Sequence, residues 1–215
     1  MSKQRVFLTG ATGGMGLASL KEMLKDADKQ DIVILARDSE KNRKILDPYR
    51  NTAGLEIVWG DLNDYDVVLK CVKDCDLILH IAAFVSPAAD YHPKQAMKVN
   101  YGSTRNLINA IYALGQQDKT RLVYIGTVAE TGDRMPPIHW GRVGDPIKPS
   151  MFDYYAVSKV AANGWSSKAA SSIGSPCARP VSLASPWPAL KMPLCSTTVW
   201  TMYWNIAPTG ILPER

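Results

Sequence analysis

A glycine-rich loop near the start of the chain constrains the fold more than any other feature. The apolar run RVFLT (5–9) leads into TGATGGMG (9–16), and a stretch with helical periodicity follows. In the spacing G-x-x-G-x-x-G, the first glycine allows a tight turn, the second lets backbone approach a pyrophosphate, and the third lets the helix pack on the sheet. The helix start adds free N–H groups and a positive dipole end. We therefore predict a phosphate-binding loop for a dinucleotide rather than a plain tight turn. The residues expected to line it are Gly10, Thr12, Gly13, Gly14, Met15 and Gly16.

Strands and helices alternate along the rest of the first 162 residues. Further apolar strands are predicted at 31–36, 55–61, 76–83 and 121–127. One long helix is predicted over 92–114, in which Gly102 is tolerated. Near-continuous apolar strands between helices indicate a parallel sheet covered on both faces. Right-handed crossovers then give an α/β fold with a doubly wound parallel sheet of the Rossmann type.

Charge, cysteine spacing and hydropathy exclude several classes of protein. The formal net charge is +5, but the segment 163–215 contributes +3 of it, so the first 162 residues are nearly neutral and we expect no nucleic-acid partner. The four cysteines lack the paired spacing of a zinc site, so we expect no metal. No run of eighteen apolar residues is present, which predicts no membrane span. The start MSKQRVFLTG lacks signal-peptide features and predicts a cytoplasmic protein.

The end of the second predicted strand bears on the choice of cofactor. An acid there binds the ribose 2′-hydroxyl of NAD, whereas an arginine accommodates the 2′-phosphate of NADP. The strand ends in LARDSEKNRK, where Arg37 comes first and Asp38 follows. Because a guanidinium suits phosphate by bidentate bonding, we favour NADP over NAD. Arg43 and Lys44 also fit an ordinary solvated helix start.

Three residues form a candidate catalytic group. Thr127 ends the fifth strand, and Tyr155 and Lys159 follow with the i, i+4 spacing that places them on one helix face. A reaction that interconverts a carbonyl and an alcohol needs a proton donor or acceptor beside the path of the hydride. The tyrosine pKa near 10 suits this poorly, and a neighbouring ammonium would lower it. A hydroxyl on the adjacent strand could hold the substrate oxygen.

Together these motifs resemble the extended short-chain dehydrogenase/reductase family, which includes NAD(P)-dependent epimerases, dehydratases, and hydroxysteroid and dihydroflavonol-type reductases. The resemblance covers residues 5–162 and rests on TGATGGMG, GDLND, HIAA, VNYGSTRNLINA, YIGTVAETG and YYAVSK. It implies that Tyr155 is the general acid/base and that Lys159 holds the nicotinamide ribose. It also implies a small-molecule substrate and is compatible with a homodimer. Further residues implied at the cofactor are Asp61 and Leu62 near the adenine, Ala82 and Ala83 along the dinucleotide, and Asn100 as a brace. His80 and His139 are read as structural or surface residues.

Residues 163–215 differ from the rest of the chain. They hold seven of the fourteen prolines and four of the six tryptophans. They begin with an Asn163-Gly164 pair that reads as a helix stop. A one-nucleotide shift of the reading frame at the boundary 162/163 permits Glu-Arg followed by an apolar strand ending in Leu-Arg-Pro-Thr-Gly-Ile. We therefore predict domains at 1–162 and 163–215, the second a frameshifted tail with little regular structure and an incomplete substrate region. A divergent proline-rich segment is the alternative.

Three functions follow from these observations. The leading one is an NAD(P)-dependent oxidoreductase or epimerase/dehydratase that transfers hydride between nicotinamide and a carbonyl or alcohol. The second is a dinucleotide-binding regulator without catalysis, on the same fold. The third is an incomplete, inactive product of an enzyme gene, in which loss of the sixth strand exposes one sheet edge. The sequence does not name the substrate.

Overall fold

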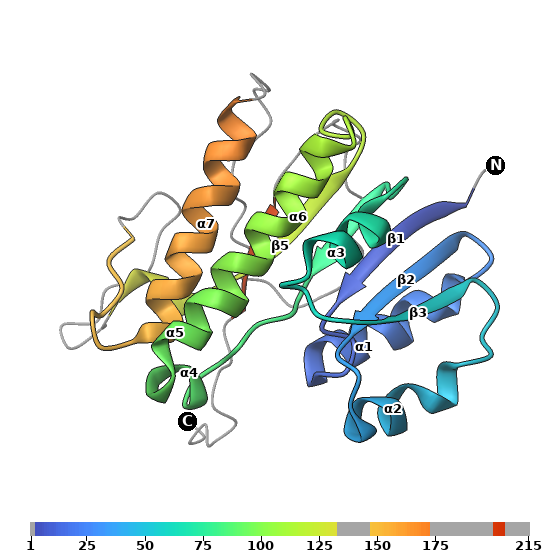
Figure 1. The fold of residues 1–215 in the computed structure, drawn as a ribbon, viewed down its shortest axis with the longest axis horizontal. Coiled ribbons are helices and arrows are strands. Elements are labelled where there is room, and N and C mark those ends of the chain that lie inside the picture. Colours follow the sequence, from blue (N-terminus) through green and yellow to red (C-terminus); the bar gives the residue numbers. More distant parts are fainter. Residues whose placement is uncertain (1–2, 133–146, 173–199, 205–215) are drawn as a thin grey trace, which may run out of the picture.

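The computed structural model describes residues 3–132, 147–172 and 200–204. Within them lies a six-stranded parallel sheet in the order β3-β2-β1-β4-β5-β6 (Figure 1). The strands are β1 (Gln4–Thr9), β2 (Gln30–Ala36), β3 (Leu55–Trp59), β4 (Leu77–His80), β5 (Arg121–Thr127) and β6 (Trp200–Trp204). The chain runs outward from β1 to β3 and then returns to β4 on the other side of β1. This reversal is the switch point at which doubly wound sheets bind ligands, outside the carboxyl ends of the strands. The predicted α/β class is confirmed.

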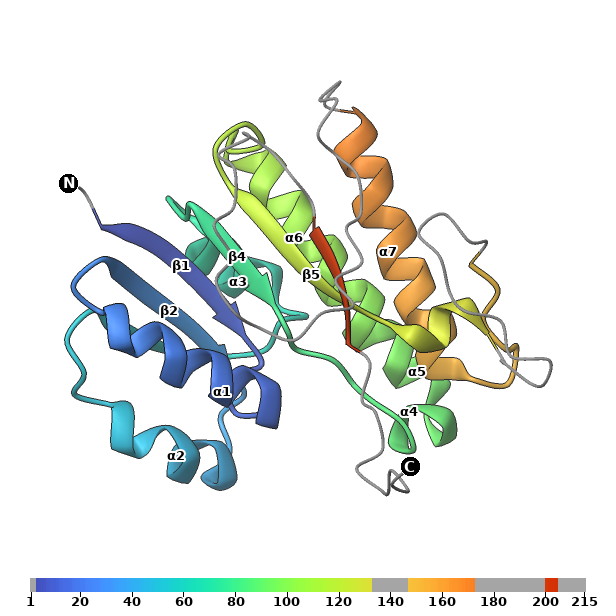
Figure 2. The same ribbon diagram turned by 180° about the vertical axis from the view of Figure 1, so that it is seen from behind.

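Helices cover both faces of the sheet, as Figures 1 and 2 show from opposite sides. They are α1 (Gly14–Met23), α2 (Glu40–Leu46), α3 (Tyr65–Val72), α4 (Ala88–Tyr91), α5 (Pro93–Ala96), α6 (Gly102–Ala113) and α7 (Tyr154–Ser172). One core lies under α1 and α2 and includes Leu8, Leu20 and Ile34. The other lies under α3 and α6 and includes Phe7, Val68 and Leu107. Strands with apolar side chains toward both layers explain the near-continuous apolar runs in the sequence.

Side-chain caps help to fix where the helices begin. Ser39 accepts a hydrogen bond from the Asn42 amide at the start of α2. Asp64 accepts hydrogen bonds from the amides of Asp66 and Val67 at the start of α3. Such caps satisfy amides that have no partner within the helix.

The long helix predicted over 92–114 is present but not uniform. It consists of α5, a π-helical turn (Met97–Tyr101) and α6. The extra residue of a π turn changes which side chains face the sheet, and such turns are frequent at functional sites. Here the turn contains Asn100, which is buried.

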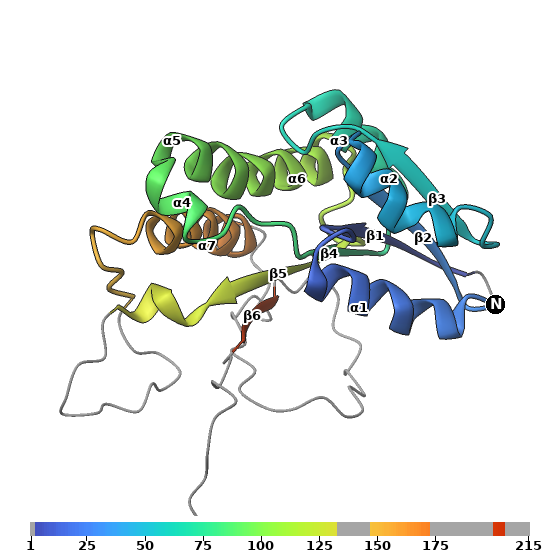
Figure 3. The ribbon, with the colours of Figure 1, turned by 90° about the horizontal axis from the view of Figure 1, so that it is seen from below.

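The segment after residue 162 departs from the expectation in two places. The Asn163-Gly164 pair does not stop α7, which continues to Ser172. Residues Trp200–Trp204 form β6, which pairs in parallel with β5 (Figure 3). The expected lack of regular structure is therefore wrong for these two stretches, and the exposed edge expected at β5 carries a strand. Residues 173–199 and 205–215 lie outside the described residues.

Candidate functional site

The glycine loop lies between β1 and α1 and has the shape expected of a phosphate cradle. Gly10 has φ +77, and a Cβ there would lie 2.7 Å from the Ala82 nitrogen. A Cβ on Gly16 would lie 2.0 Å from the Gly10 carbonyl oxygen, so only glycine fits at both positions. By contrast, a Cβ on Gly14 would meet nothing within 4 Å. The loop is therefore closed toward β4 and open toward solvent.

Backbone amides provide the binding surface of this loop. α1 begins at Gly14, and its N-cap Gly13 has no side chain to cap it. The first amides of a helix have no intrahelical partner and carry the positive end of the dipole. Thr12 is half-buried and Met15 is exposed at the same turn. Free amides at an uncapped helix start are the chemistry that a pyrophosphate requires.

The end of β2 presents opposite charges to solvent. Arg37 and Asp38 are both exposed, and the Arg37 carbonyl accepts a hydrogen bond from Asn42 Nδ2 at 2.8 Å. Arg43 binds Asp38 in a bidentate manner, with N–O distances of 2.6 and 2.8 Å. The Arg43 guanidinium also lies 4.7 Å from the ring centroid of Trp59. The carboxylate of Asp38 is thus engaged, and the Arg43 hydrogen bond holds its pKa below the ordinary value.

The residues after β3 and β4 lie at the same carboxyl edge. Asp61 is exposed and its Oδ1 accepts from the Asn63 amide at 2.8 Å, while the Leu62 carbonyl accepts from Asn106 of α6 at 3.0 Å. Ala82 and Ala83 are half-buried. The Ala82 amide donates to Thr9 Oγ1 at 3.1 Å, which ties the turn after β4 to the end of β1.

His80 is part of a buried hydrogen-bond chain, which confirms the structural reading. Its Nδ1 lies 2.9 Å from Thr9 Oγ1, and its Nε2 lies 3.2 Å from Thr104 Oγ1. Thr9 accepts from Ala82, and Thr104 donates to the Asn100 carbonyl, so the chain is satisfied when His80 is neutral and carries its proton on Nε2. Burial lowers the pKa of His80 to about 3, which keeps it neutral. His139 lies outside the described residues.

Asn100 braces the start of α7 against the loop after β4. Its Oδ1 accepts from the Phe84 amide at 2.7 Å, and its Nδ2 donates to the Phe84 carbonyl at 3.0 Å and to Ser158 Oγ at 2.8 Å. Ser158 in turn donates to the Tyr155 carbonyl at 2.7 Å. These bonds join the loop after β4, the π turn and α7, and Ser158 is one residue away from Lys159.

Thr127 lies at the carboxyl end of β5, and Tyr155 and Lys159 lie on α7, which packs against β5. The Thr127 hydroxyl lies near enough to Tyr155 to lower the pKa of its phenol, and Lys159 is 3% exposed with its Nζ 4.0 Å from the ring centroid of Tyr124. Thr9, His80 and Tyr124 are consecutive partners across β1, β4 and β5. The three candidate catalytic residues therefore lie at one end of the carboxyl edge of the sheet, and the glycine loop lies at the same edge.

The expected electrostatics of this group need a correction. Burial raises the pKa of Tyr155, and among the described residues the group that lowers it is Thr127, not Lys159. Burial also lowers the pKa of Lys159, to about 7. The spacing of Tyr155 and Lys159 was read correctly, but the sequence does not reveal that both groups are desolvated, and desolvation opposes charge on each.

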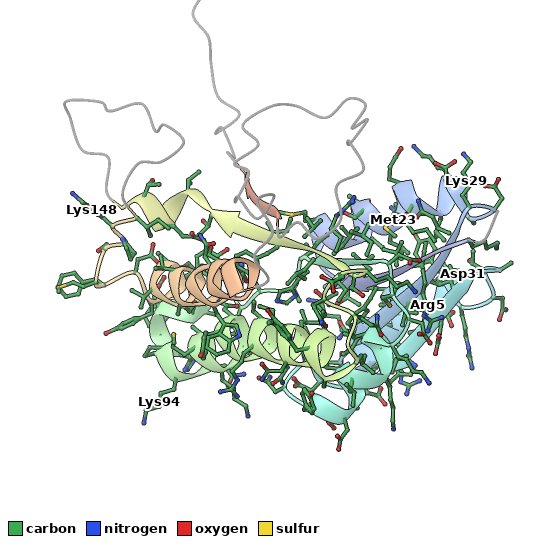
Figure 4. All side chains as sticks on the ribbon, turned by 90° about the horizontal axis from the view of Figure 1, so that it is seen from above. Arg5, Met23, Lys29, Asp31, Lys94 and Lys148 are labelled. Carbon is green, nitrogen blue, oxygen red and sulfur yellow. The ribbon has the colours of Figure 1, made fainter. Side chains whose placement is uncertain are left out.

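The sequence analysis missed Glu130. It is fully buried in the 3₁₀ turn Val128–Thr131 that follows β5. Its Oε1 accepts from the Thr127 amide at 3.3 Å, and its Oε2 accepts from Asn163 Nδ2 at 2.9 Å. The Glu130 carbonyl also accepts from the Lys148 amide at 3.0 Å, and Lys148 lies at the end of the molecule that carries α7 (Figure 4). Thr127-x-x-Glu130 is a capping box, a signal present in the sequence.

The described part of the chain shows neither a metal-binding cluster nor a membrane-spanning helix. It holds no group of three or more His, Cys, Asp or Glu side chains that could bind a metal ion. None of its helices has the length and apolar character needed to cross a bilayer. Cys71 and Cys75 are buried free thiols whose pKa values burial raises to about 12 and about 11. Cys177 and Cys195 lie outside the described residues.

The family model described as the NAD dependent epimerase/dehydratase family matches residues 6–196. The match extends past residue 162, where the resemblance seen in the sequence ended.

Two relatives illustrate the range of similar sequences. UDP-N-acetylglucosamine 4,6-dehydratase (inverting) from Campylobacter jejuni is 28% identical over 115 residues, which are 53% of this chain and 34% of that protein. D-erythronate dehydrogenase from Cupriavidus necator is 29% identical over 142 residues, 62% of this chain and 41% of that protein. The chain thus spans less than half the length of these two relatives.

Solved structures show the same fold. DesIV, a dTDP-glucose 4,6-dehydratase from Streptomyces venezuelae with NAD and TYD bound, matches with a TM-score of 0.68 at 22% identity, covering 80% of this chain and 53% of that chain. The UDP-Glc/GlcNAc 4-epimerase from Campylobacter jejuni matches with a TM-score of 0.68 at 21% identity, covering 79% of this chain and 50% of that chain.

Proposed function

This chain belongs to the NAD dependent epimerase/dehydratase family, and from that premise we propose that it binds NADP or NAD and acts on a small molecule as an oxidoreductase or epimerase/dehydratase. The observation that carries this proposal is the placement of Thr127, Tyr155 and Lys159 at the edge of the sheet that also holds the glycine loop. A protein that only bound a dinucleotide would have no need of Thr127, Tyr155 and Lys159 at this edge.

The residues present fit a dinucleotide. Amides at the start of α1 would hold the pyrophosphate. The loop is packed against backbone at Gly10 and Gly16 and is open at Gly14, where the ligand would approach. Asp61 and Leu62 would lie at the adenine, and Ala82 and Ala83 along the path between the two ends. When bound, the nicotinamide supplies or accepts a hydride at the substrate carbon.

Proton transfer is the task of Tyr155. A raised pKa leaves its phenol protonated at neutral pH, so in carbonyl reduction it can donate the proton to the substrate oxygen. In the reverse direction it must accept a proton, and the Thr127 hydroxyl, which lowers its pKa, assists that step. Lys159 would bind the nicotinamide ribose and add positive charge behind the phenol.

The end of β2 supports NADP over NAD. Asp38 is bound by Arg43 in a bidentate manner, so its negative charge, which would repel a 2′-phosphate, is offset. Arg37 is exposed beside it and suits a 2′-phosphate. The structural relative DesIV has NAD bound, so both cofactors belong in the test.

The test separates binding from catalysis. Calorimetric titration of the chain with NADP and with NAD should show binding of both, tighter for NADP. Turnover is then assayed on a panel that includes nucleotide sugars and sugar acids, the substrate classes in the names of the relatives. Tyr155→Phe should reduce turnover by roughly 10²–10⁴-fold with cofactor affinity kept, since general acid–base catalysis contributes about that much.

Two outcomes would favour the alternatives. Full turnover in Tyr155→Phe would remove the proposed acid/base. Tight cofactor binding with no turnover on any substrate would favour a dinucleotide-binding regulator or an incomplete enzyme.

Sequencing the DNA around codon 162 decides whether the tail is frameshifted. The proposed homodimer is checked by light scattering on the same sample.

A further inference from the structure

Lys159 is in an unusual position for a cation. It is 3% exposed, on the side of α7 that packs against β5. A buried ammonium is costly unless other groups compensate for the water it has lost. Because the proposed role of Lys159 requires positive charge beside the cofactor, the groups that compensate for burial are part of the working site.

Tyr124 contacts Lys159 at both ends of that residue. The ring of Tyr124 lies 4.0 Å from Nζ, and its hydroxyl donates to the Lys159 carbonyl at 3.2 Å. Tyr124 is itself fully buried on β5. The face of an aromatic ring attracts a cation, most strongly where water is excluded. One side chain thus holds both the ammonium and the backbone of Lys159.

Glu130 supplies a buried negative charge on the same side of α7. Its Oε2 accepts from Asn163, which is one helical turn after Lys159, and its Oε1 accepts from the amide of Thr127. The carboxylate is therefore held between the turn that carries Thr127 and the helix that carries Lys159. Glu130 raises the pKa of Lys159, against the effect of burial.

The other ionisable groups on the elements that pack on α7 are neutral, half-buried or exposed, and β5 adds the half-buried Arg121. His80 on β4 is kept neutral by burial, and Tyr155 on α7 has a raised pKa and is a neutral phenol. The remaining elements packed on α7 are α4, α5, the π turn and α6, and their charged residues are the half-buried Asp90 and the exposed Lys94, Lys98 and Arg105.

We propose that Tyr124 and Glu130 are positioning residues that together favour the charged form of Lys159 and fix it beside the cofactor, Tyr124 through its ring and hydroxyl and Glu130 through its carboxylate. This rests on the role of Lys159 in the proposed function. The site is then held by two bridges to α7 that are a single turn apart, one from Tyr124 of β5 to Lys159 and one from Glu130 of the following 3₁₀ turn to Asn163.

The test measures the titration of Lys159 in the full 215-residue chain without cofactor or substrate. Lysine labelled with ¹³C at Cε gives one resonance per lysine, and the Lys159 resonance is the one lost in Lys159→Met. In the parent chain it should titrate well below the other lysines. In Glu130→Gln its midpoint should fall by at least about one pH unit, since loss of a nearby opposite charge has roughly that effect. Glu56→Gln, at an exposed acid, is the matched control and should leave the midpoint unchanged.

A second pair of variants tests Tyr124 independently. Tyr124→Phe keeps the ring and should leave the midpoint within about 0.3 units, whereas Tyr124→Leu should lower it by about one unit. An unchanged midpoint in both Glu130→Gln and Tyr124→Leu would overturn the proposal. If Glu130→Gln does not fold, the Cδ resonance of Glu130 in the parent chain decides instead: a protonated carboxyl at pH 7 would also overturn it. Turnover does not enter this measurement, so failure here is distinct from failure of the Tyr155→Phe test.

Discussion

Backbone sterics shape the phosphate loop at Gly10 and Gly16, whereas buried polar side chains shape the catalytic corner formed by Thr127, Tyr155 and Lys159. In the loop, the added Cβ would collide with main-chain atoms, which cannot rotate away. In the candidate catalytic corner the supporting partners come from three elements: Tyr124 of β5 donates to Lys159, Glu130 of the next turn accepts from the Thr127 amide, and Asn100 of the π turn donates to Ser158. We therefore expect Gly10 and Gly16 to tolerate almost no added volume, and the corner to be sensitive to charge and pH.

The largest effect is expected at Gly16. Gly16→Ala places a Cβ against the Gly10 carbonyl, and we expect it to cost at least about 3 kcal/mol in the free energy of unfolding, because backbone must move. Gly14→Ala is the matched control, since its Cβ meets nothing within 4 Å, and alanine should be neutral or stabilising by up to ~1 kcal/mol. Urea unfolding of both variants measures the difference. Equal stability of the two would contradict the steric account of the loop.

The second effect concerns the pH dependence of stability and tests the buried chain at His80. The pKa of His80 is about 3 in the folded chain against 6.5 for a free imidazole, so the unfolded chain binds the proton first as pH falls. The contribution of His80 to the free energy of unfolding is complete above pH 6.5. It decreases by roughly 2–4 kcal/mol as the pH falls toward 3.

The measurement is urea unfolding at intervals between pH 7 and pH 4. His80→Gln cannot titrate and should lose stability less steeply with acid, whereas His92→Gln, at an exposed histidine, should follow the parent. If His80→Gln does not fold, the ring resonances of His80 in the parent decide. A shift of those resonances with a midpoint near pH 6.5 would show that the imidazole is not held neutral.

A third, smaller effect is expected at Asn100. Asn100→Ala removes hydrogen bonds to Phe84 and Ser158 and leaves buried polar groups unpaired, which should cost about 2 kcal/mol in the free energy of unfolding. Asn109→Ala, at an exposed position on α6, is the control and should change stability by less than about 0.5 kcal/mol. The comparison is made by thermal unfolding. A loss at Asn100 no greater than that at Asn109 would mean that the brace is not needed.

The smallest effect is expected at Arg37 and concerns only the choice of cofactor. Arg37→Ala should weaken NADP binding by about 10-fold, as loss of a charge-assisted hydrogen bond to phosphate does at an exposed site. NAD binding should change little. Lys41→Ala removes a charge from an exposed position on α2 and serves as the control. Equal weakening of NADP and NAD in Arg37→Ala would remove the argument for NADP.

The sequence predicts those parts of the structure that depend on neighbouring residues. The glycine loop and the five strands up to Thr127 follow from local spacing and apolar runs, and each strand was found within a few residues of its expected bounds. The i, i+4 pair Tyr155 and Lys159 was placed correctly because one helix sets its geometry.

The missed features depend on contacts between distant segments. The pKa values of Tyr155 and Lys159 follow from burial, which neither residue type nor spacing reveals. Asn163 reads as a helix stop in isolation, yet its side chain binds a buried carboxylate 33 residues earlier and the helix continues. Glu130 could have been noticed from the capping box with Thr127, but its approach to α7 could not.

The pairing of β6 with β5 has a consequence for how this sheet chooses its neighbours. The pairing joins Val123–Thr127 to Trp200–Trp204 through main-chain groups, which every residue except proline offers in the same form. Residues 200–204 contain no proline. The hydrogen bonds at the outer side of β5 therefore require an extended partner without proline at the paired positions. Side-chain packing contributes the rest of the preference for a partner strand.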